Sequence, residues 1–392
     1  MTLVNKHDIK LKVAIGHPRL GWGGSEKRVM WGIDALKADY DVTLITAGDF
    51  DLAELNQYYA TSLRPTDFKI RQVPLPFFLR NNSKATAMRY ALYQRFCRSI
   101  AHEFDMLISA YGPCDFGVPA MHFIADFSWD DEIRQRLHTV AHGLIYKDNL
   151  LRKSYMRIAR MLSKPSGRNL FAGEDEIIAV SQWVADIMKD KYRVDCQVIN
   201  SPVPGEFPTV PHQKRQNGFV CLGRIAPEKR IERIVAIIRS VRENDSDLHL
   251  HIIGEIGNDA YGKQIKKLAQ DNSGWIFCEG LLFGEEKVKM LTTHRFGIHA
   301  CQGDAFPGAV ADMIKAGCIT FVPCNGGQVD MVNHPALIYK SQEDAATKIV
   351  NVLCNNSLQN EVVNHLKNQA ENFSTEKFQS EFRDAVFKFL KK

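Results

Sequence analysis

The sequence predicts an α/β protein with two Rossmann-like domains, each built on a doubly wound parallel sheet. Short β-branched runs alternate with amphipathic helical stretches along the chain, which is typical of parallel sheets covered by helices on both faces. The alternation pauses in a proline-rich segment at residues 200–211 and then restarts, which indicates a domain boundary. The length of 392 residues gives each domain enough chain for its own hydrophobic core.

The expected elements of the first series follow from β-branched runs and from apolar residues at helical spacing. Strands are expected at residues 11–15, 41–45, 106–109, 119–123, 176–180 and 197–199. Helices are expected at 25–38, where Ser25 is a suitable N-cap, and at 182–191.

The second series repeats this pattern after the proline-rich segment. Strands are expected at residues 219–222, 249–253, 275–278, 296–300 and 319–322, and helices at 231–242, 261–270, 285–292 and 309–316. Two doubly wound domains leave an interdomain cleft between the carboxyl ends of their sheets, and ligands bind there in such folds.

Composition and charge exclude several classes of protein. With 45% hydrophobic and 24% charged residues, the chain is neither collagen-like nor disordered. Its apolar runs fall short of the ~20 residues of a membrane span, and its polar start lacks the apolar core of a secretory signal. The nine scattered cysteines are expected to be reduced thiols in a cytoplasmic protein. A net charge of +5 is too small to indicate a nucleic-acid partner.

A glycine-rich loop joins the first strand to the first helix. Gly23 and Gly24 precede Ser25 at the start of that helix, where backbone amides and the helix dipole favour a phosphate. The alternative is a tight turn without a ligand. Glu26 occupies the position of the third glycine of a dinucleotide-binding fingerprint, so that fingerprint is not present.

Two cations mark the turn after the first strand of the second series. Arg224 and Lys229 could clamp a diphosphate, the arginine as a planar fork and the lysine as a point charge. The alternative is a solvated basic turn in which Glu228 is the ionic partner.

Two acids lie around the start of the expected helix at 309–316. Asp304 falls in the preceding loop, where it could face sugar hydroxyls, and Asp312 falls on the helix, where it could hold a ribose. The backbone amides around residues 306–309 add an anion site at the helix N-terminus. The alternative makes Asp304 a turn residue and Asp312 an acid favoured by the helix dipole.

Together these motifs resemble those of the family-4 retaining glycosyltransferases, which have the GT-B fold. The family has a Gly-Gly-x-Glu loop, an Arg-x4-Lys turn and an acid-x7-acid motif. Here these are Gly23 to Glu26, Arg224 with Lys229, and Asp304 with Asp312, in the family's order. The stretch from His17 to Trp31 looks closest to the mannosyltransferases that build lipid-linked oligosaccharides.

The resemblance implies a domain organisation and a role for each motif. Residues 1–203 with 375–392 would form the acceptor-side domain, and 204–374 the domain that binds a nucleotide diphosphate sugar. No essential metal is expected, because cations and amides would neutralise the leaving diphosphate. The implied catalytic residues are Arg224, Lys229, His122 and Asp304; the donor-binding residues are Gly23, Gly24, Asp312, Phe306, Pro307, Gly308 and Glu255; and Asp126 is implied on the acceptor side.

The sequence departs from the family at both acids, where the family usually has Glu and this chain has Asp. Each carboxylate is drawn back by one C–C bond, about 1.5 Å, and such a displacement can cost on the order of 100-fold in rate. This departure has three alternative explanations. The pocket is narrower and compensates for the shorter side chains, or the donor sugar differs, or the activity is reduced.

Other histidines and a basic segment complete the candidates. His138 with His142, and His249 with His251, have the spacing of paired metal ligands but no evident third ligand, so structural or surface roles are expected. Residues 146–168, from Tyr146 to Arg168, are rich in Lys and Arg. This segment could face an anionic membrane as a peripheral contact, or its cations could simply be solvated.

The expected function is retaining transfer of a hexose from a GDP- or UDP-sugar to a hydroxyl of a glycan or lipid-linked acceptor. The resemblance implies a front-face displacement in which the leaving phosphate takes the acceptor proton. One alternative is a GT-B nucleotide-sugar epimerase or hydrolase that uses no acceptor. Another is a catalytically weak sugar-nucleotide binding protein, which the pair of Asp residues makes relevant.

Overall fold

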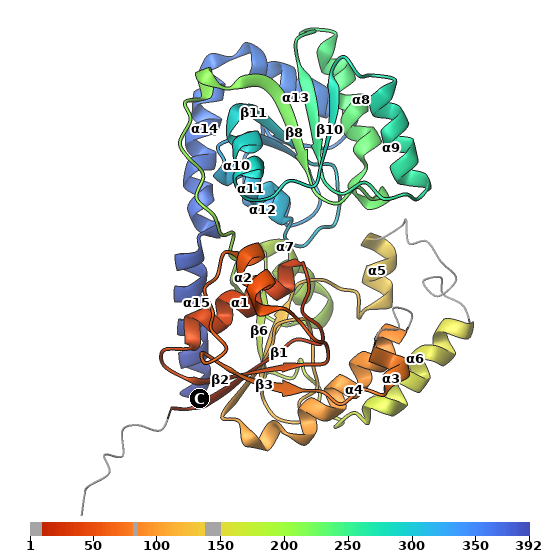
Figure 1. Ribbon diagram of the computed structural model, residues 1–392, viewed down its shortest axis with the longest axis vertical. Helices are drawn as coiled ribbons and strands as arrows, with labels where there is room; N and C mark the ends of the chain where they lie inside the picture. Colours follow the sequence, from red (N-terminus) through yellow and green to blue (C-terminus); the bar gives the residue numbers. More distant parts are fainter. Residues whose placement is uncertain (1–9, 81–84, 138–149) are drawn as a thin grey trace, which may run out of the picture. The chain divides into compact units, whose positions relative to one another are not determined.

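The computed structural model describes residues 10–80, 85–137 and 150–392, which form two compact α/β units (Figure 1). The first unit contains the described parts of 1–127 and 141–204, together with Thr375–Lys392. The second contains Gly205–Ser374 and the described part of Ser128–Val140. The predicted boundary near residue 203 lies next to the division at Pro204, and the prediction did not assign residues 128–137 to the second unit.

The sheet of the first unit is fully parallel, and its strand order is β3-β2-β1-β4-β5-β6-β7. The strands are β1 (Lys12–Gly16), β2 (Asp41–Thr46), β3 (Lys69–Gln72), β4 (Met106–Ser109), β5 (Met121–Ile124), β6 (Glu176–Ala179) and β7 (Gln197–Val198). The α-helices are α1 (Gly24–Leu36), α2 (Leu52–Tyr59), α3 (Phe77–Arg80), α4 (Thr86–Ser99), α6 (Leu150–Ser163), α7 (Gln182–Ile187) and α15 (Thr375–Leu390).

The final helix α15 packs against α1 in the first unit (Figure 1). Phe378 and Phe382 of α15 are both buried, and the Phe382 ring lies 5.7 Å from that of Phe123 on β5. Gly32 makes room for this contact, since a Cβ at Gly32 would lie 3.0 Å from the Phe382 ring. The C-terminal segment is therefore part of the core of the first unit.

The sheet of the second unit is also parallel, and its order is β10-β9-β8-β11-β12-β13. Its strands are β8 (Gln216–Leu222), β9 (His249–Ile253), β10 (Ile276–Gly280), β11 (His294–Ile298), β12 (Ile319–Pro323) and β13 (Ile338–Tyr339). Its α-helices are α5 (Asp131–Leu137), α8 (Ile231–Arg242), α9 (Ala260–Gln270), α10 (Gly284–Thr293), α11 (Gly308–Lys315), α12 (Gln328–Val332), α13 (Gln342–Cys354) and α14 (Asn356–Ala370).

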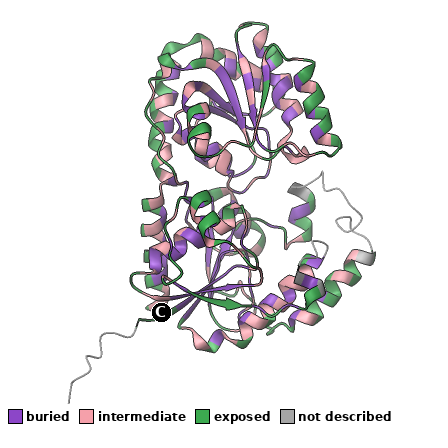
Figure 2. Ribbon diagram, viewed as in Figure 1, coloured by how far each residue is buried: buried purple, intermediate pink, exposed green. Residues whose placement is uncertain are grey.

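In both units the central strands are buried, while the outer helix faces are exposed (Figure 2). Because helices cover both faces of a parallel sheet, its strands are apolar along their whole length rather than alternating. In the described part of the chain no helix is both long enough and apolar enough to cross a bilayer.

The predicted α/β class with two doubly wound parallel sheets is confirmed. The sequence pattern did not predict β3, because every residue of this edge strand is exposed and buried residues do not alternate with exposed ones along it. The helix expected at 182–191 ends earlier, since α7 stops at Ile187 and a single π-helical stretch follows at Met188–Tyr192.

Candidate functional site

Each sheet reverses its strand order at one pair of strands, and the candidate residues follow those strands. The reversal lies between β1 and β4 in the first unit and between β8 and β11 in the second. In open α/β sheets, ligands bind at the carboxyl ends of the strands beside such a reversal. The glycine loop follows β1, while the Arg224 and Asp304 loops follow β8 and β11.

In the second unit, Lys229 and Asp304 form an ion pair across the reversal, with Nζ and Oδ2 3.0 Å apart. About a quarter of each side chain is exposed, 23% for Lys229 and 24% for Asp304. The short Asp304 side chain thus reaches the lysine, and its carboxylate also accepts a hydrogen bond from the Phe306 amide. The structure therefore brings together two residues that the sequence placed 75 positions apart.

Mutual attraction keeps both members of this pair charged. Burial raises the pKa of Asp304, but the Lys229 ammonium and the Phe306 amide outweigh it, and the pKa is lowered overall. Burial lowers the pKa of Lys229, but the charge of Asp304 and the hydrogen bond it accepts from the ammonium outweigh burial and raise this pKa to about 12. Lys229 is therefore a fixed cation that could stabilise a developing phosphate charge.

Arg224 and Glu255 lie on neighbouring loops of the same edge. The Gly223 amide donates to the Ile253 carbonyl at 2.9 Å, and the Ile225 amide donates to the Glu255 carbonyl at 3.2 Å. The Arg224 side chain is 75% exposed and pairs with Glu228 at 2.9 Å. Its guanidinium is thus accessible to a ligand. The contact with Glu228 is the ion pair that the alternative interpretation of the sequence predicts.

Asp312 lies on α11 and pairs with Lys287 of α10, with Oδ2 and Nζ 3.2 Å apart. The sequence pattern gave no sign of Lys287, which is 25 residues away. Pro307 is the N-cap of α11, and no described residue accepts a hydrogen bond from the amides of Gly308 and Ala309. These two amides remain available for an anion, whereas the Phe306 amide is used by Asp304.

In the first unit the glycine loop is held by Tyr59 from α2. The Gly23 amide donates to the Tyr59 hydroxyl at 2.7 Å, and that hydroxyl in turn donates to the Gly21 carbonyl. Gly23 therefore does not offer its amide to a phosphate in this structure, contrary to its expected role. No described residue accepts from the amides of Gly24, Ser25 and Glu26, so the N-terminus of α1 retains that capacity.

Behind the glycine loop lies a buried arginine that the sequence analysis missed. Arg28 is 4% exposed and donates to the Ser201 hydroxyl at 2.8 Å, the Ala110 carbonyl at 3.2 Å and the Gly24 carbonyl at 3.3 Å. Burial lowers its pKa to about 10, while the charges of Glu26 and Asp126 act in the opposite direction. In the sequence, Arg28 looks like a residue on the exposed face of α1. Its burial depends on contacts with Ala110 and Ser201, which are far away in the chain.

Asp126 follows β5 and is exposed, as an acceptor-side residue would have to be. Its charge acts on Arg28 and also contributes to raising the pKa of Tyr111, for which burial is the main cause. The structure thus groups Asp126 with Arg28 and the glycine loop.

His122 does not join this group, and its position disagrees with the sugar-contacting role expected for it. It is the second residue of β5 rather than the residue at its end, and it is 0% exposed. Its Nε2 lies 3.3 Å from Asp175 Oδ1, and its Nδ1 accepts from the Cys114 amide. An imidazole enclosed in this way has a packing role.

His17 follows β1 and lies beside the glycine loop. Its Nε2 is 3.0 Å from the Ser25 hydroxyl, which donates to Glu26 at 2.8 Å. Burial lowers the pKa of His17 to about 4. In the second unit, burial and the Lys229 charge likewise lower the pKa of His299 to about 3. Both imidazoles are neutral at pH 7.

These two histidines predict acid destabilisation. Their pKa values are lowered from 6.5, so the unfolded chain binds more protons, and stability is lost as the pH falls from 6.5 towards 3–4. At pH 5 each should cost about 2 kcal/mol. Thermal unfolding at pH 7.5 and pH 5 should show the loss, and His299→Gln should reduce it. The matched control is His102→Gln at an exposed position. Equal pH sensitivity in both variants would contradict the assignment.

Parts of two predictions lie outside the described residues. These are His138 with His142, and the segment at 146–149 that begins the basic stretch. Of the rest, α6 packs on α4 and exposes both cations and apolar side chains. The exposed side chains of α6 include Lys153, Arg157, Arg160, Ile158 and Met161.

Residues 205–373 match the family model of the glycosyl transferases group 1. No curated protein sequence gives a significant match. Similar solved structures cover nearly all of the chain at low sequence identity, so they establish the fold and nothing finer.

Three of these structures are representative. WaaG, a glycosyltransferase involved in lipopolysaccharide biosynthesis, is 14% identical over 95% of this chain and 99% of its own, with a TM-score of 0.65. Sucrose-phosphate synthase from Thermosynechococcus elongatus is 11% identical over 97% and 99%, with a TM-score of 0.70. HepE from Anabaena, in complex with UDP and glucose, is 12% identical over 96% and 99%, with a TM-score of 0.64.

Proposed function

We propose that this chain, which has the GT-B fold and matches the glycosyl transferases group 1 family over residues 205–373, transfers a hexose with retention from a nucleotide diphosphate sugar to a hydroxyl of a glycan or lipid-linked acceptor. The observation that carries the proposal is the Lys229–Asp304 pair at the strand-order reversal of the second sheet. A fixed cation and a carboxylate are held there side by side at the edge where α/β sheets bind ligands.

In this proposal the cations of the second unit act on the leaving group. Lys229 and the accessible Arg224 stabilise the charge that develops on the β-phosphate, which is the largest catalytic contribution expected here. The amides of Gly308 and Ala309 bind the same anion from the N-terminus of α11. The leaving phosphate takes the proton of the acceptor hydroxyl in a front-face displacement.

The carboxylates orient the rest of the donor. Asp304 accepts hydrogen bonds from the sugar hydroxyls next to Lys229, and Asp312 accepts them from the ribose. Asp312 is also paired with Lys287. A bound ribose would either replace the lysine as the partner of this carboxylate or bind beside it. We propose that the donor is a UDP-sugar, because the crystal structure of HepE, a protein with the same fold, contains UDP and glucose.

For the first unit we propose that the amides of Gly24, Ser25 and Glu26 bind a phosphate and that Asp126 orients the acceptor. The exposed cations and apolar side chains of α6 would keep the protein on an anionic membrane surface, where a lipid-linked acceptor is found.

A nucleotide screen tests the donor assignment. UDP and UDP-sugars at about 100 times their dissociation constant should stabilise the folded chain by roughly 2.7 kcal/mol. The unfolding midpoint is measured with UDP, GDP, ADP and their sugars. A shift with GDP but not UDP would overturn the choice of base, and no shift with any nucleotide would overturn the donor site.

Product analysis separates the activity from its alternatives. Incubation of a stabilising nucleotide sugar without acceptor should leave the donor intact. Release or isomerisation of the sugar under these conditions would identify a hydrolase or epimerase. Binding without turnover over an acceptor panel would identify a sugar-nucleotide binding protein.

A further inference from the structure

Three histidines meet at the amino-terminal edge of the second sheet, away from the loops described above. His249 and His251 lie on one face of β9, and His294 is the first residue of β11. Strand β8 separates β9 from β11. The candidate donor site follows the carboxyl ends of β8 and β11, so the sheet itself separates the two places.

A glycine in the intervening strand lets the histidines approach each other. Gly218 of β8 is in register with His249, and a Cβ there would lie 2.2 Å from His249 Nε2. The ring centroids are 5.1 Å apart for His249 and His251, 5.3 Å for His249 and His294, and 4.5 Å for His251 and His294. One ring nitrogen from each residue lies within 4.8 Å of the others.

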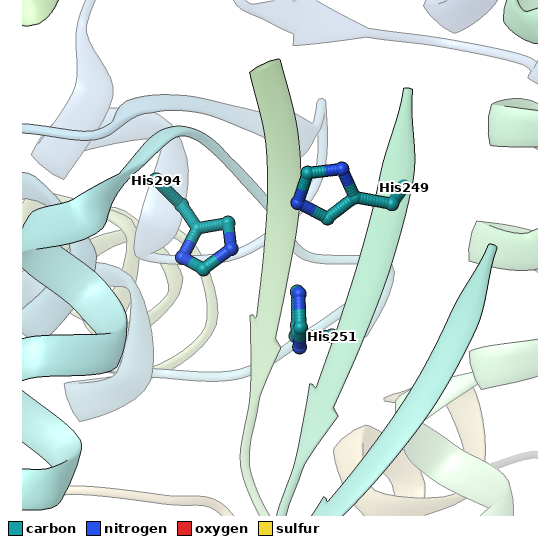
Figure 3. Close-up of side chains that lie close together, drawn as sticks. All are labelled: His249, His251 and His294. Atoms are coloured by element: carbon teal, nitrogen blue, oxygen red, sulfur yellow. The ribbon is translucent and has the colours of Figure 1, made fainter. Parts of the chain in front are cut away.

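Each imidazole has an outer partner that fixes its orientation. His251 Nδ1 lies 2.7 Å from Glu279 Oε1, and His294 Nδ1 donates to the Met290 carbonyl at 2.7 Å. His249 hydrogen-bonds to the backbone of Asp247. The remaining nitrogens point toward one another, as Figure 3 shows. A carboxylate or carbonyl behind each ligating imidazole is the usual outer shell of a metal site.

His294 carries a second, independent sign of a ligand. The residue is 2% exposed, and its Nε2 is buried without a hydrogen-bond partner among the described residues. A buried polar atom without a partner costs about 1–3 kcal/mol. A cation bound to the lone pair of this nitrogen would remove that cost.

Two charged side chains face the cluster. The Glu279 carboxylate, whose Oε1 lies 2.7 Å from His251 Nδ1, favours a bound cation. The Arg242 guanidinium, which lines the same cavity as His249 and His251, opposes one.

We propose that His249, His251 and His294 bind a divalent transition metal ion of the zinc class. Imidazole ligands suit Zn²⁺, Ni²⁺, Cu²⁺ and Co²⁺. Bonds of about 2.05 Å in a tetrahedral site would place the nitrogens roughly 3.4 Å from one another, whereas here they lie within 4.8 Å, so the rings would move inward on binding. His249 and His251 also line a cavity of about 530 Å³, through which an ion could enter. The ion would link β9 to β11 across β8, and Glu279 is a positioning residue.

A second cluster in the same unit, His299, Cys301 and Asp304, does not support the same conclusion. Asp304 is already paired with Lys229, and the positive charge of that lysine lies within the cluster. Burial raises the pKa of Cys301 to about 11, which keeps it a thiol rather than the thiolate that metals bind.

The test uses the full chain after removal of bound metal with a chelator. Co²⁺ should give the visible ligand-field bands of a tetrahedral nitrogen site, and Zn²⁺ should displace it and raise the unfolding midpoint. The double variant His249→Gln, His251→Gln changes side chains that are only partly buried and should lose both signals. His365→Gln is the control, since this histidine of α14 instead contacts the Val332 carbonyl.

Two further variants test the geometry. Glu279→Gln should weaken Zn²⁺ binding about 10- to 100-fold, and Gly218→Ala should displace His249 and weaken it as well. Absence of Co²⁺ bands in the unmodified chain, or unchanged Zn²⁺ binding in the double variant, would overturn the proposal. The nucleotide-induced shift should persist in the double variant, so the metal site and the donor site can fail separately.

Discussion

Lys229→Ala is expected to lower turnover of the nucleotide sugar about 100- to 1000-fold, the cost of removing one preorganised group that stabilises transition-state charge. The substitution removes the cation 3.0 Å from Asp304 and leaves that carboxylate without its ionic partner. The loss should fall mainly on kcat, because the phosphate charge develops in the transition state. Initial rates with the donor selected by the nucleotide screen measure it.

The control for this prediction is Lys263→Ala, which removes the same charge from an exposed position on α9. Its rate should stay within a few-fold of the unmodified enzyme. If Lys229→Ala behaves in the same way while remaining folded, the lysine has no role in stabilising the leaving phosphate. Asp304→Asn then shows whether the carboxylate contributes on its own.

Gly254→Ala is expected to destabilise the second unit by about 2–4 kcal/mol, through overpacking and backbone strain together. Gly254 has a φ of +157°, and a Cβ there would lie 1.9 Å from the Gly223 carbonyl oxygen. Both atoms in this contact are tied to the backbone, so neither can move aside cheaply. Thermal unfolding should show a midpoint lower by several degrees.

The same substitution should also lower activity, because a side chain at Gly254 would push against Gly223 and strain the hydrogen bonds from Gly223 to Ile253 and from Ile225 to Glu255 that join the two loops. Gly274→Ala is the matched control, since a Cβ at that position would meet nothing within 4 Å. A midpoint for Gly254→Ala equal to that of Gly274→Ala would show that the two loops can separate without cost.

The local pattern of the chain was sufficient for most strands of the two sheets and for helices α1, α8, α9, α10 and α11. Helix α8 and strand β9 begin and end where their apolar periodicity predicts. Strand β3 could not be found in this way, because an exposed edge strand depends on pairing with β2 rather than on its own apolar residues. The fold class therefore followed from periodicity, whereas the edge strands β3 and β13 and the helices α2, α12, α13 and α14 were not predicted.

Contacts between distant segments could not be predicted from spacing. The motifs identified Lys229 and Asp304 as candidates, but not that they form a pair. Arg28 and Lys287 were missed, and His122 was assigned to a substrate although the fold encloses it. The sequence analysis did not group His294 with His249 and His251. Spacing along the chain identifies residues on one face of the same strand, but it does not identify residues on different strands of a sheet.

By itself, the sequence determined two α/β domains and the loops in which the candidate residues lie, because periodicity and turn residues act over a few positions. The tertiary structure decided which of those residues meet, which are buried, and which amide groups remain free. Gly23 gives its amide to Tyr59, while Asp304 finds Lys229. The physical reason is that burial and pairing depend on strand order, which brings residues far apart in the chain to one edge of a sheet.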